Sequence, residues 1–207
     1  MRPTGYVQQL GLICGLGLLL SGCLFRPTRV PTRLFILAPI PVPEHAPAGA
    51  PQSSVEVGFV KMPAYLLRDP LIVRKSANEI KCLEDALWAE RLDQSFRQVL
   101  ADNLSAMLGS NQGYTSASEP DRGMVRVSVE VKQFDVDTQG RGTLIAWWHL
   151  TAPGSDKPVK GGQTRLSRAG PSPRGNPQAI ATTLSALTAD FSQELAQAIH
   201  QSAATRP

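Results

Sequence analysis

Cysteine, long apolar runs and clusters of like charge are all scarce in this chain of 207 residues. The apolar run at residues 10–20 is shorter than the roughly 20 residues that a permanent transmembrane helix needs. Lysine and arginine form no cluster and the net charge is a mild +4, so a nucleic-acid partner is not expected. No internal repeat is present, and the length suits one domain with its own core.

Residue patterns typical of catalysis or metal binding are also missing. The three histidines (His45, His149 and His200) lack the spacing of metal ligands, and no Gly-x-Ser-x-Gly motif occurs. The adjacent carboxylates Glu84 and Asp85 are predicted to lie at the start of a helix, where they would interact with its dipole. His149 is predicted to be a sheet residue held by a neighbour. We therefore predict no catalytic residues, no metal and no cofactor, and an anchored enzyme is the least favoured function.

The N-terminus has the parts of a bacterial lipoprotein signal peptide. Arg2 supplies positive charge, and residues 10–20 have the length of the apolar region of such a peptide. The motif Leu20-Ser21-Gly22-Cys23 that follows resembles a lipobox. This resemblance implies that Cys23 is lipidated and becomes the first residue of the mature protein. The alternative is a soluble secreted protein in which the cysteine falls here by chance.

Lipidation would leave one free thiol in the mature chain. Cys14 would be removed with the signal peptide and Cys23 would be acylated, so Cys82 would have no disulfide partner and is predicted to be a small buried hydrophobe. Position 24 is leucine, whereas in enteric-type sorting an aspartate there retains a lipoprotein at the inner membrane. The resemblance therefore favours the periplasmic face of the outer membrane.

The sequence divides into a signal peptide, a linker and a folded domain. We predict the signal peptide at residues 1–22 and the domain at residues 54–203. Residues 23–53 would hold the lipidated tether, a first short strand at residues 34–37 and a proline-rich loop. If that strand joins the domain, the free tether is about ten residues long and reaches roughly 30 Å. The domain would then stay close to the membrane.

Alternating apolar residues predict the strands of the domain. The clearest series, residues 125–131, predicts a half-buried strand, and a phase shift at Phe134 predicts a β-bulge near Lys132-Gln133. Residues 143–151, apolar on both faces, predict a strand that is central or covered on both sides. Further strands are predicted at residues 55–60, 71–74, 79–83 and 160–168. The 71–74 and 79–83 strands would form a hairpin, and the last three strands of the chain would form an antiparallel meander.

Two helices are predicted from 3.6-residue periodicity. The first covers residues 92–108 and ends at Gly109, a natural C-cap, and Asp93 or Asp85 could cap its start. The last helix begins near Asn176, which would cap it. Its buried stripe is predicted to consist of Ile180, Leu184, Leu187, Phe191, Leu195 and Ile199.

Several sequence blocks resemble the PqiC/YmbA family of ABC-type transport auxiliary lipoproteins. They are residues 57–66 (VGFVKMPAYL), residues 72–74 (IVR), residues 88–92 (WAERL), and then Phe96, Val99-Leu100 and Asn103-Leu104. The order and spacing of these blocks are specific together. The resemblance implies a single α/β domain, in which two main helices pack on a mixed β-sheet that includes the antiparallel meander.

The resemblance also implies a function without catalysis, in intermembrane lipid transport. Such lipoproteins accompany an MCE-domain protein and its ABC or PqiA-like membrane component, and act by docking, with self-association into a homo-oligomer. The alternative is a monomeric periplasmic lipoprotein that carries lipid or another ligand itself, which requires an apolar cavity.

Three residues of the matching blocks are candidate interface residues. Pro63 fixes the backbone so that Tyr65 would be presented at a strand end, which suits a subunit contact. Trp88 is either a core anchor or a residue that contacts lipid or a partner, because tryptophan is enriched at interface hot spots. Trp147 and Trp148 would point to opposite faces of their strand, so one of them would lie under a helix or at an interface.

Overall fold

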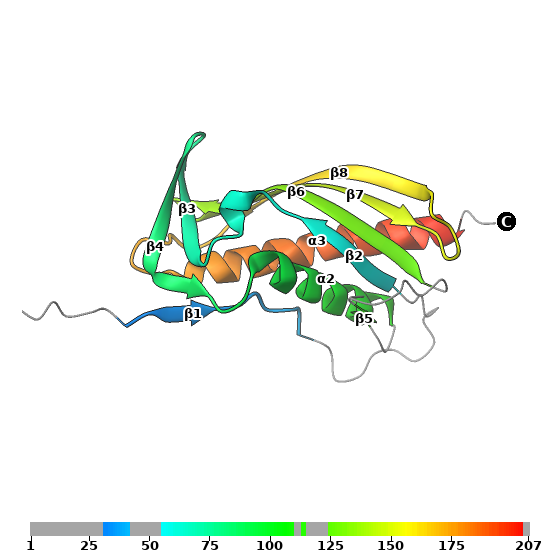
Figure 1. The fold of residues 1–207 in the computed structure, drawn as a ribbon, viewed down its shortest axis with the longest axis horizontal. Helices are drawn as coiled ribbons and strands as arrows, with labels where there is room; N and C mark the ends of the chain where they lie inside the picture. Colours follow the sequence, from blue (N-terminus) through cyan, green and yellow to red (C-terminus); the bar gives the residue numbers. More distant parts are fainter. Residues whose placement is uncertain (1–30, 42–54, 110–112, 115–123, 205–207) are drawn as a thin grey trace, which may run out of the picture. The chain divides into compact units, whose positions relative to one another are not determined.

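A long strand, β6 (Val125–Asp137), organises the sheet in the computed structural model, which describes residues 31–41, 55–109, 113–114 and 124–204 (Figure 1). One edge of β6 pairs antiparallel with β7 (Arg141–Thr151), and β7 pairs antiparallel with β8 (Pro158–Ala169). The predicted antiparallel meander is confirmed, and β7 is a central strand.

The opposite edge of β6 pairs with two strands in succession. Strand β2 (Val55–Lys61) runs parallel to its first half, and β3 (Pro70–Ser76) runs parallel to its last residues, where Val73 pairs with Val136. A 3-10 turn, η2 (Ala64–Leu66), connects β2 to β3. The crossover between them therefore lies beside the middle of β6.

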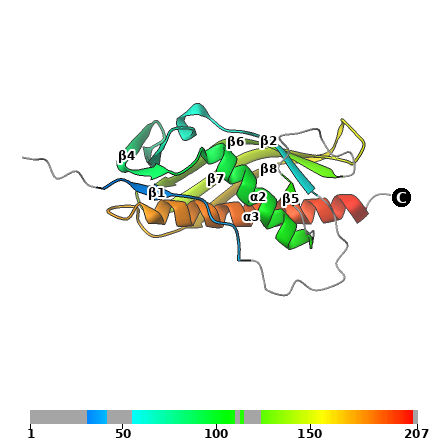
Figure 2. The same cartoon turned by 60° about the horizontal axis from the view of Figure 1, so that its bottom comes forward.

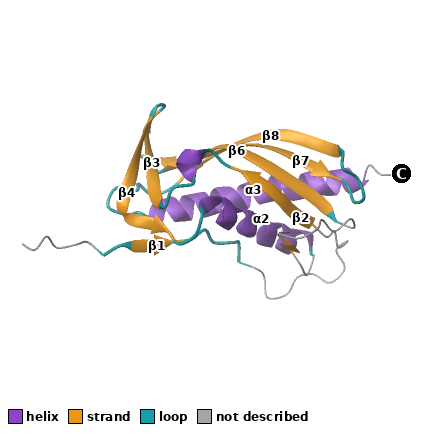
Figure 3. Ribbon diagram, in the orientation of Figure 1, coloured by secondary structure: helices purple, strands orange, loops and turns teal. Residues whose placement is uncertain are grey.

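The remaining strands extend the sheet to its two outer edges. β4 (Glu79–Trp88) forms the predicted hairpin with β3, and β1 (Arg33–Phe35) pairs parallel with β4. The two-residue strand β5 (Gly113–Tyr114) pairs with β2. The result is the expected mixed sheet, with eight strands among the described residues (Figure 3).

The predicted β-bulge in β6 decides which side chains leave the core. The register with β7 shifts between Val131 and Gln133, and the buried series of valines continues at Phe134 and Val136. Because side chains alternate along a strand, Asp135 therefore points to the face opposite Phe134.

Both predicted helices are present and cover one face of the sheet (Figure 2). Helix α2 (Leu92–Leu108) ends at Gly109, whose φ of 66° is left-handed as a C-cap requires. All six residues of the predicted stripe on α3 (Gln178–Ala204) are buried. At the centre, the Phe96 ring of α2 lies 5.1 Å from Phe134 and 6.3 Å from Phe191, measured between centroids. These rings join both helices to the sheet.

The predicted bounds of α2 are confirmed, but the predicted capping residue was wrong. The N-cap position is Arg91, which makes no side-chain capping bond, and Asp93 lies in the first turn, where it binds Arg91. Glu84 and Asp85 lie in β4 and not at a helix start. Pairing with β1 extends β4 as far as Trp88, so long-range strand pairing overrides the local preference of these carboxylates.

The positions of His149 and Cys82 can be compared with their predictions. His149 is exposed on the face of β7 that neither α2 nor α3 covers, and among the described residues no hydrogen-bond partner holds it. Cys82 is free and half-buried against the core. The signal peptide, Cys23 and His45 lie outside the described residues, as do residues 42–54 of the proline-rich loop.

Candidate interface at the crossover and the open sheet face

The crossover between β2 and β3 turns sharply after Pro63. The Pro63 backbone is extended (φ −57°, ψ 142°), and its carbonyl accepts a hydrogen bond from Leu66 N at 3.0 Å. The η2 turn that follows buries Leu66 in the core and leaves Tyr65 half-buried on the outer side. The predicted presentation of Tyr65 by Pro63 therefore has a local structural basis.

Beneath Tyr65 lies a buried carboxylate with several donors. Asp135 is 2% exposed, and Arg74 donates to it from Nε (2.9 Å to each carboxylate oxygen) and from Nη2 (2.5 Å). The Tyr65 hydroxyl donates at 3.2 Å, and Gln133 Nε2 donates at 2.9 Å. The carboxylate thus joins the crossover, β3 and β6 at one point, as a buried charge requires if it is to be tolerated.

The surroundings of this cluster shift two ionisation equilibria. Burial, followed by the negative charge of Asp135, raises the pKa of Tyr65 to about 12. The hydrogen bond to Asp135 raises the pKa of the Arg74 guanidinium above its ordinary value. Both groups therefore keep their protons across the physiological pH range, so the cluster is a fixed structural connection and not a pH switch near neutrality.

An open hollow of about 390 Å³ lies above the cluster. Arg74 has no N–H group left for a ligand there. Its Nε and Nη2 donate to Asp135, Nη2 also donates to the Tyr65 hydroxyl at 3.2 Å, and Nη1 donates to the carbonyls of Ser76 and Ala77 at 3.5 and 3.2 Å. The hollow thus offers a surface for contact, but no free guanidinium N–H of Arg74. Its lining residues are Tyr65, Arg74, Ala77, Asn78, Ile80, Lys132 and Gln133.

Next to the hollow, the uncovered face of the sheet exposes two aromatic rings. Phe59 on β2 is 69% exposed and Trp147 on β7 is 49% exposed, whereas Trp148 is buried under the helices. Lys132 Nζ lies 4.2 Å from the centroid of the Trp147 ring. Aromatic side chains of this kind are enriched in the centres of protein interfaces.

The acidic residues on this face are already paired. Glu130 binds Lys61 at 3.2 Å and Lys132 at 2.6 Å, and Glu56 binds Arg126 at 3.2 Å. Pairing reduces the charge that a partner would have to desolvate and leaves the aromatic rings as the main contact area. Sequence reasoning considered Trp147 but missed Phe59, because strict alternation after Val55 and Val57 would point Phe59 inward and only the register shift of β2 turns it outward.

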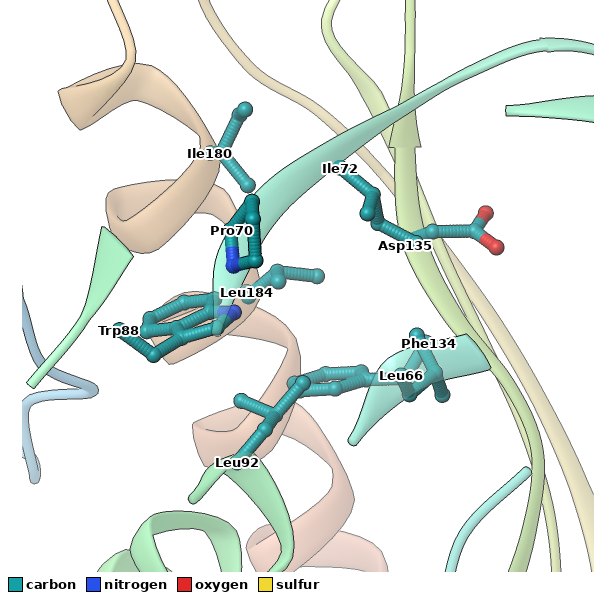
Figure 4. A pocket seen from close by; sticks show the side chains of 9 residues that line it. All are labelled: Leu66, Pro70, Ile72, Trp88, Leu92, Phe134, Asp135, Ile180 and Leu184. Atoms are coloured by element: carbon teal, nitrogen blue, oxygen red, sulfur yellow. The ribbon is translucent and has the colours of Figure 1, made fainter. Parts of the chain in front are cut away.

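Trp88 lies on the core side of the crossover, away from the Tyr65 hydroxyl. It is 8% exposed, and its backbone N donates to the carbonyl of Asp69 at 2.7 Å. Its ring borders an enclosed cavity of about 10 Å³ (Figure 4), which has room for one water at most. The cavity is lined by Leu66, Pro70, Ile72, Trp88, Leu92, Phe134, Asp135, Ile180 and Leu184.

The described part of the chain offers neither a metal site nor a membrane-spanning helix. No three His, Cys, Asp or Glu side chains gather there as they would around a metal ion. No helix there has the length and apolar character to cross a membrane.

Comparison with known proteins identifies the family. The model of a family described as "ABC-type transport auxiliary lipoprotein component" matches residues 35–196. This transport auxiliary family is not known for catalysis. A search of curated protein sequences found no match.

Solved structures share the fold. The crystal structure of an uncharacterized protein superposes with a TM-score of 0.64 at 20% identity, covering 82% of this chain and 99% of that one. The structure of a Xanthomonas campestris protein superposes with a TM-score of 0.61 at 17% identity, covering 80% of this chain and 93% of that one. Because the family model spans most of the sequence, the chain belongs to the ABC-type transport auxiliary lipoprotein family, which includes PqiC and YmbA.

Proposed function

We propose that this protein is an outer-membrane-anchored auxiliary lipoprotein of an MCE/ABC-type intermembrane lipid transport system. Membership of the family supports the role of auxiliary component in ABC-type transport. The lipobox at Cys23 and the leucine at position 24 support lipid attachment and the periplasmic face of the outer membrane. The partners would be an MCE-domain protein and its ABC or PqiA-like membrane component.

The mode of action that we propose is docking and assembly. The observation that carries it is the exposed aromatic face, which lies on a domain whose described core cavity is too small for a lipid. The enclosed cavity beside Trp88 has room for one water, not for an acyl chain. Phe59 and Trp147, by contrast, expose most or half of their surface on a rigid sheet. We define the docking surface by Phe59, Trp147, Tyr65 and Pro63, and a homo-oligomer or a partner would use it.

Light scattering on residues 27–207, alone and mixed with the MCE-domain protein encoded beside it, tests this proposal. A closed oligomer or a stable complex is expected. Trp147→Ser and Phe59→Ser should each weaken that assembly at least tenfold, as interface aromatics do when truncated. Val159→Ser is the matched control, because Val159 is 53% exposed on the neighbouring strand β8 and lies outside the docking surface.

The alternative function gives a different result in the same experiment. A monomer that ignores the MCE-domain protein and retains lipid through purification would identify a carrier, and the docking proposal would fail. Extraction of the purified domain followed by lipid mass spectrometry measures that outcome directly.

A further inference from the structure

The first strand of the domain exposes two aliphatic side chains. In β1 and the residues after it, Phe35 and Leu37 point into the core with 9% and 3% exposure. Leu34 and Ile36 alternate with them and are 66% and 60% exposed. Strand β1 lies at the outer edge of the sheet (Figure 2). Leu34 pairs there with the half-buried Leu87 of β4, so these residues form one small apolar patch. We refer to Leu34, Ile36 and Leu87 as the edge patch.

A partner strand would find little to bind at this edge. Ala89 N donates to the Phe35 carbonyl at 2.8 Å, so the Phe35 peptide groups face β4 and those of Leu34 and Ile36 face the open edge. That edge has no partner strand among the described residues. β1 is three residues long and lies between Pro31 and Pro39. Short edge strands near prolines are a known protection against strand addition, so the edge patch needs another explanation.

The segment that follows β1 is fixed to both helices. Ala38 N donates to Ser185 Oγ of α3 at 3.0 Å, and Ile40 N donates to Asn103 Oδ1 of α2 at 2.8 Å. The buried Asn103 also donates to Ser192 Oγ at 3.1 Å. Leu34 and Ile36 are thus held on a rigid support, which favours a permanent surface over a loose chain end.

Chain length limits how far the edge patch can be from the anchor. Arg33 lies ten residues after Cys23, a reach of roughly 33 Å when fully extended. Arginines occupy positions 26, 29 and 33 of this stretch, and no acidic residue occurs in it. Basic residues next to an anchor are attracted to the headgroups of a bilayer. These three arginines outnumber the two exposed carboxylates of Glu84 and Asp85 on β4. The two carboxylates would be repelled by anionic headgroups and so keep the contact shallow.

We infer that Leu34 and Ile36 contact the surface of the lipid bilayer that holds the acylated Cys23. This inference rests on the proposed lipid anchor. An exposed aliphatic pair on a rigid strand, joined to the anchor by a short basic linker, matches the two-signal rule for stable attachment of a protein to a membrane. The contact would limit rotation of the domain on its tether and leave Phe59 and Trp147, on β2 and β7, free for a protein partner.

Quenching of tryptophan fluorescence by brominated phospholipid tests the contact. The mature lipoprotein is purified from membranes and reconstituted in phosphatidylethanolamine–phosphatidylglycerol vesicles that contain the brominated lipid. Leu34→Trp and Ile36→Trp each add one tryptophan to the three of the wild type. Phe59→Trp is the matched control, because position 59 is as exposed as position 34 but lies in β2. We expect at least half of the added fluorescence to be quenched at positions 34 and 36, and none at position 59.

Mass spectrometry of the N-terminal peptide distinguishes a failure of the anchor from a failure of the bilayer contact alone. If Cys23 is acylated and positions 34 and 36 are quenched no more than position 59, the bilayer contact is wrong and the anchor stands. If the backbone amides of β1 instead become protected from hydrogen exchange only when a protein partner is added, the edge patch serves strand addition and the bilayer contact is also wrong. If Cys23 carries no lipid, both the anchor and the contact are overturned.

Discussion

The ionisation of Tyr65 links the stability of the crossover to pH. Its pKa is raised to about 12, first by burial and then by the charge of Asp135, whereas an unfolded tyrosine titrates near pH 10. The stability that the protonated hydroxyl contributes is therefore complete below pH 10 and is lost as the pH rises through 10 towards 12. We predict that the free energy of unfolding falls more steeply over this range in the wild type than in Tyr65→Phe.

Urea unfolding followed by circular dichroism at a series of alkaline pH values measures this difference. At neutral pH the Tyr65→Phe variant should be less stable by about 1 kcal/mol, the usual contribution of one hydrogen bond, because Arg74 and Gln133 continue to bind Asp135. The phenylalanine keeps the ring, so its packing is matched. Parallel pH profiles for the two proteins would mean that the hydroxyl is not buried against a carboxylate.

At the scale of elements, one close contact between α3 and the sheet depends on a glycine. A Cβ atom at Gly142 of β7 would lie 2.6 Å from Thr183 Cγ2 and 2.7 Å from Leu187 Cδ1, both on α3. We predict that Gly142→Ala forces α3 away from β7 and costs about 1–3 kcal/mol, the range for overpacked cores. Urea unfolding with circular dichroism measures the cost.

A second glycine supplies the control for that substitution. Gly154 has a φ of 72° and no atom within 4 Å of an added Cβ. Gly154→Ala should therefore lower the free energy of unfolding only by the cost of a left-handed backbone at alanine, about 1 kcal/mol. If Gly142→Ala is no less stable than Gly154→Ala, α3 does not pack closely against β7 at Gly142.

Local periodicity predicted most helices and strands because each of them buries one face, and burial of one face produces a regular spacing of apolar residues. The alternating valines before the bulge and the stripe of α3 both follow from burial of a single face, and both are confirmed. The extension of β4 through Glu84 and Asp85 could not be read locally, because it depends on pairing with β1, about fifty residues earlier. The division of one edge of β6 between β2 and β3 was hidden for the same reason.

At the scale of the whole molecule, the candidate interface was only partly predictable. Pro63 and Tyr65 come from a contiguous block of the sequence, so the block itself pointed to them. Asp135 and Arg74 are brought to Tyr65 only by the fold, and neither was distinguished by its own neighbours in the chain. Phe59 is exposed because β2 has an irregular register between Val57 and Val60, which no periodicity of the short strand indicated.

The predicted anchor and the folded domain make separable contributions, and this gives a last prediction. Cys23 precedes the first described strand by ten residues, whereas the core draws its residues from Phe35 onward. We predict that Cys23→Ala, exported behind a conventional secretory signal peptide, folds with an unchanged urea midpoint. It should move from the membrane fraction to the soluble periplasmic fraction and fail to support the proposed lipid transport.

Cys82→Ser is the matched control for this experiment. It removes the other cysteine of the mature chain, a half-buried thiol without a disulfide partner, and should remain in the membrane fraction with full function. The two variants together separate location from folding: the docking surface is intact in both, and only the distance to the membrane differs. Full transport by the unanchored Cys23→Ala protein would mean that the domain works as a free periplasmic carrier, because a docking component that must connect a fixed partner to a membrane cannot act from solution.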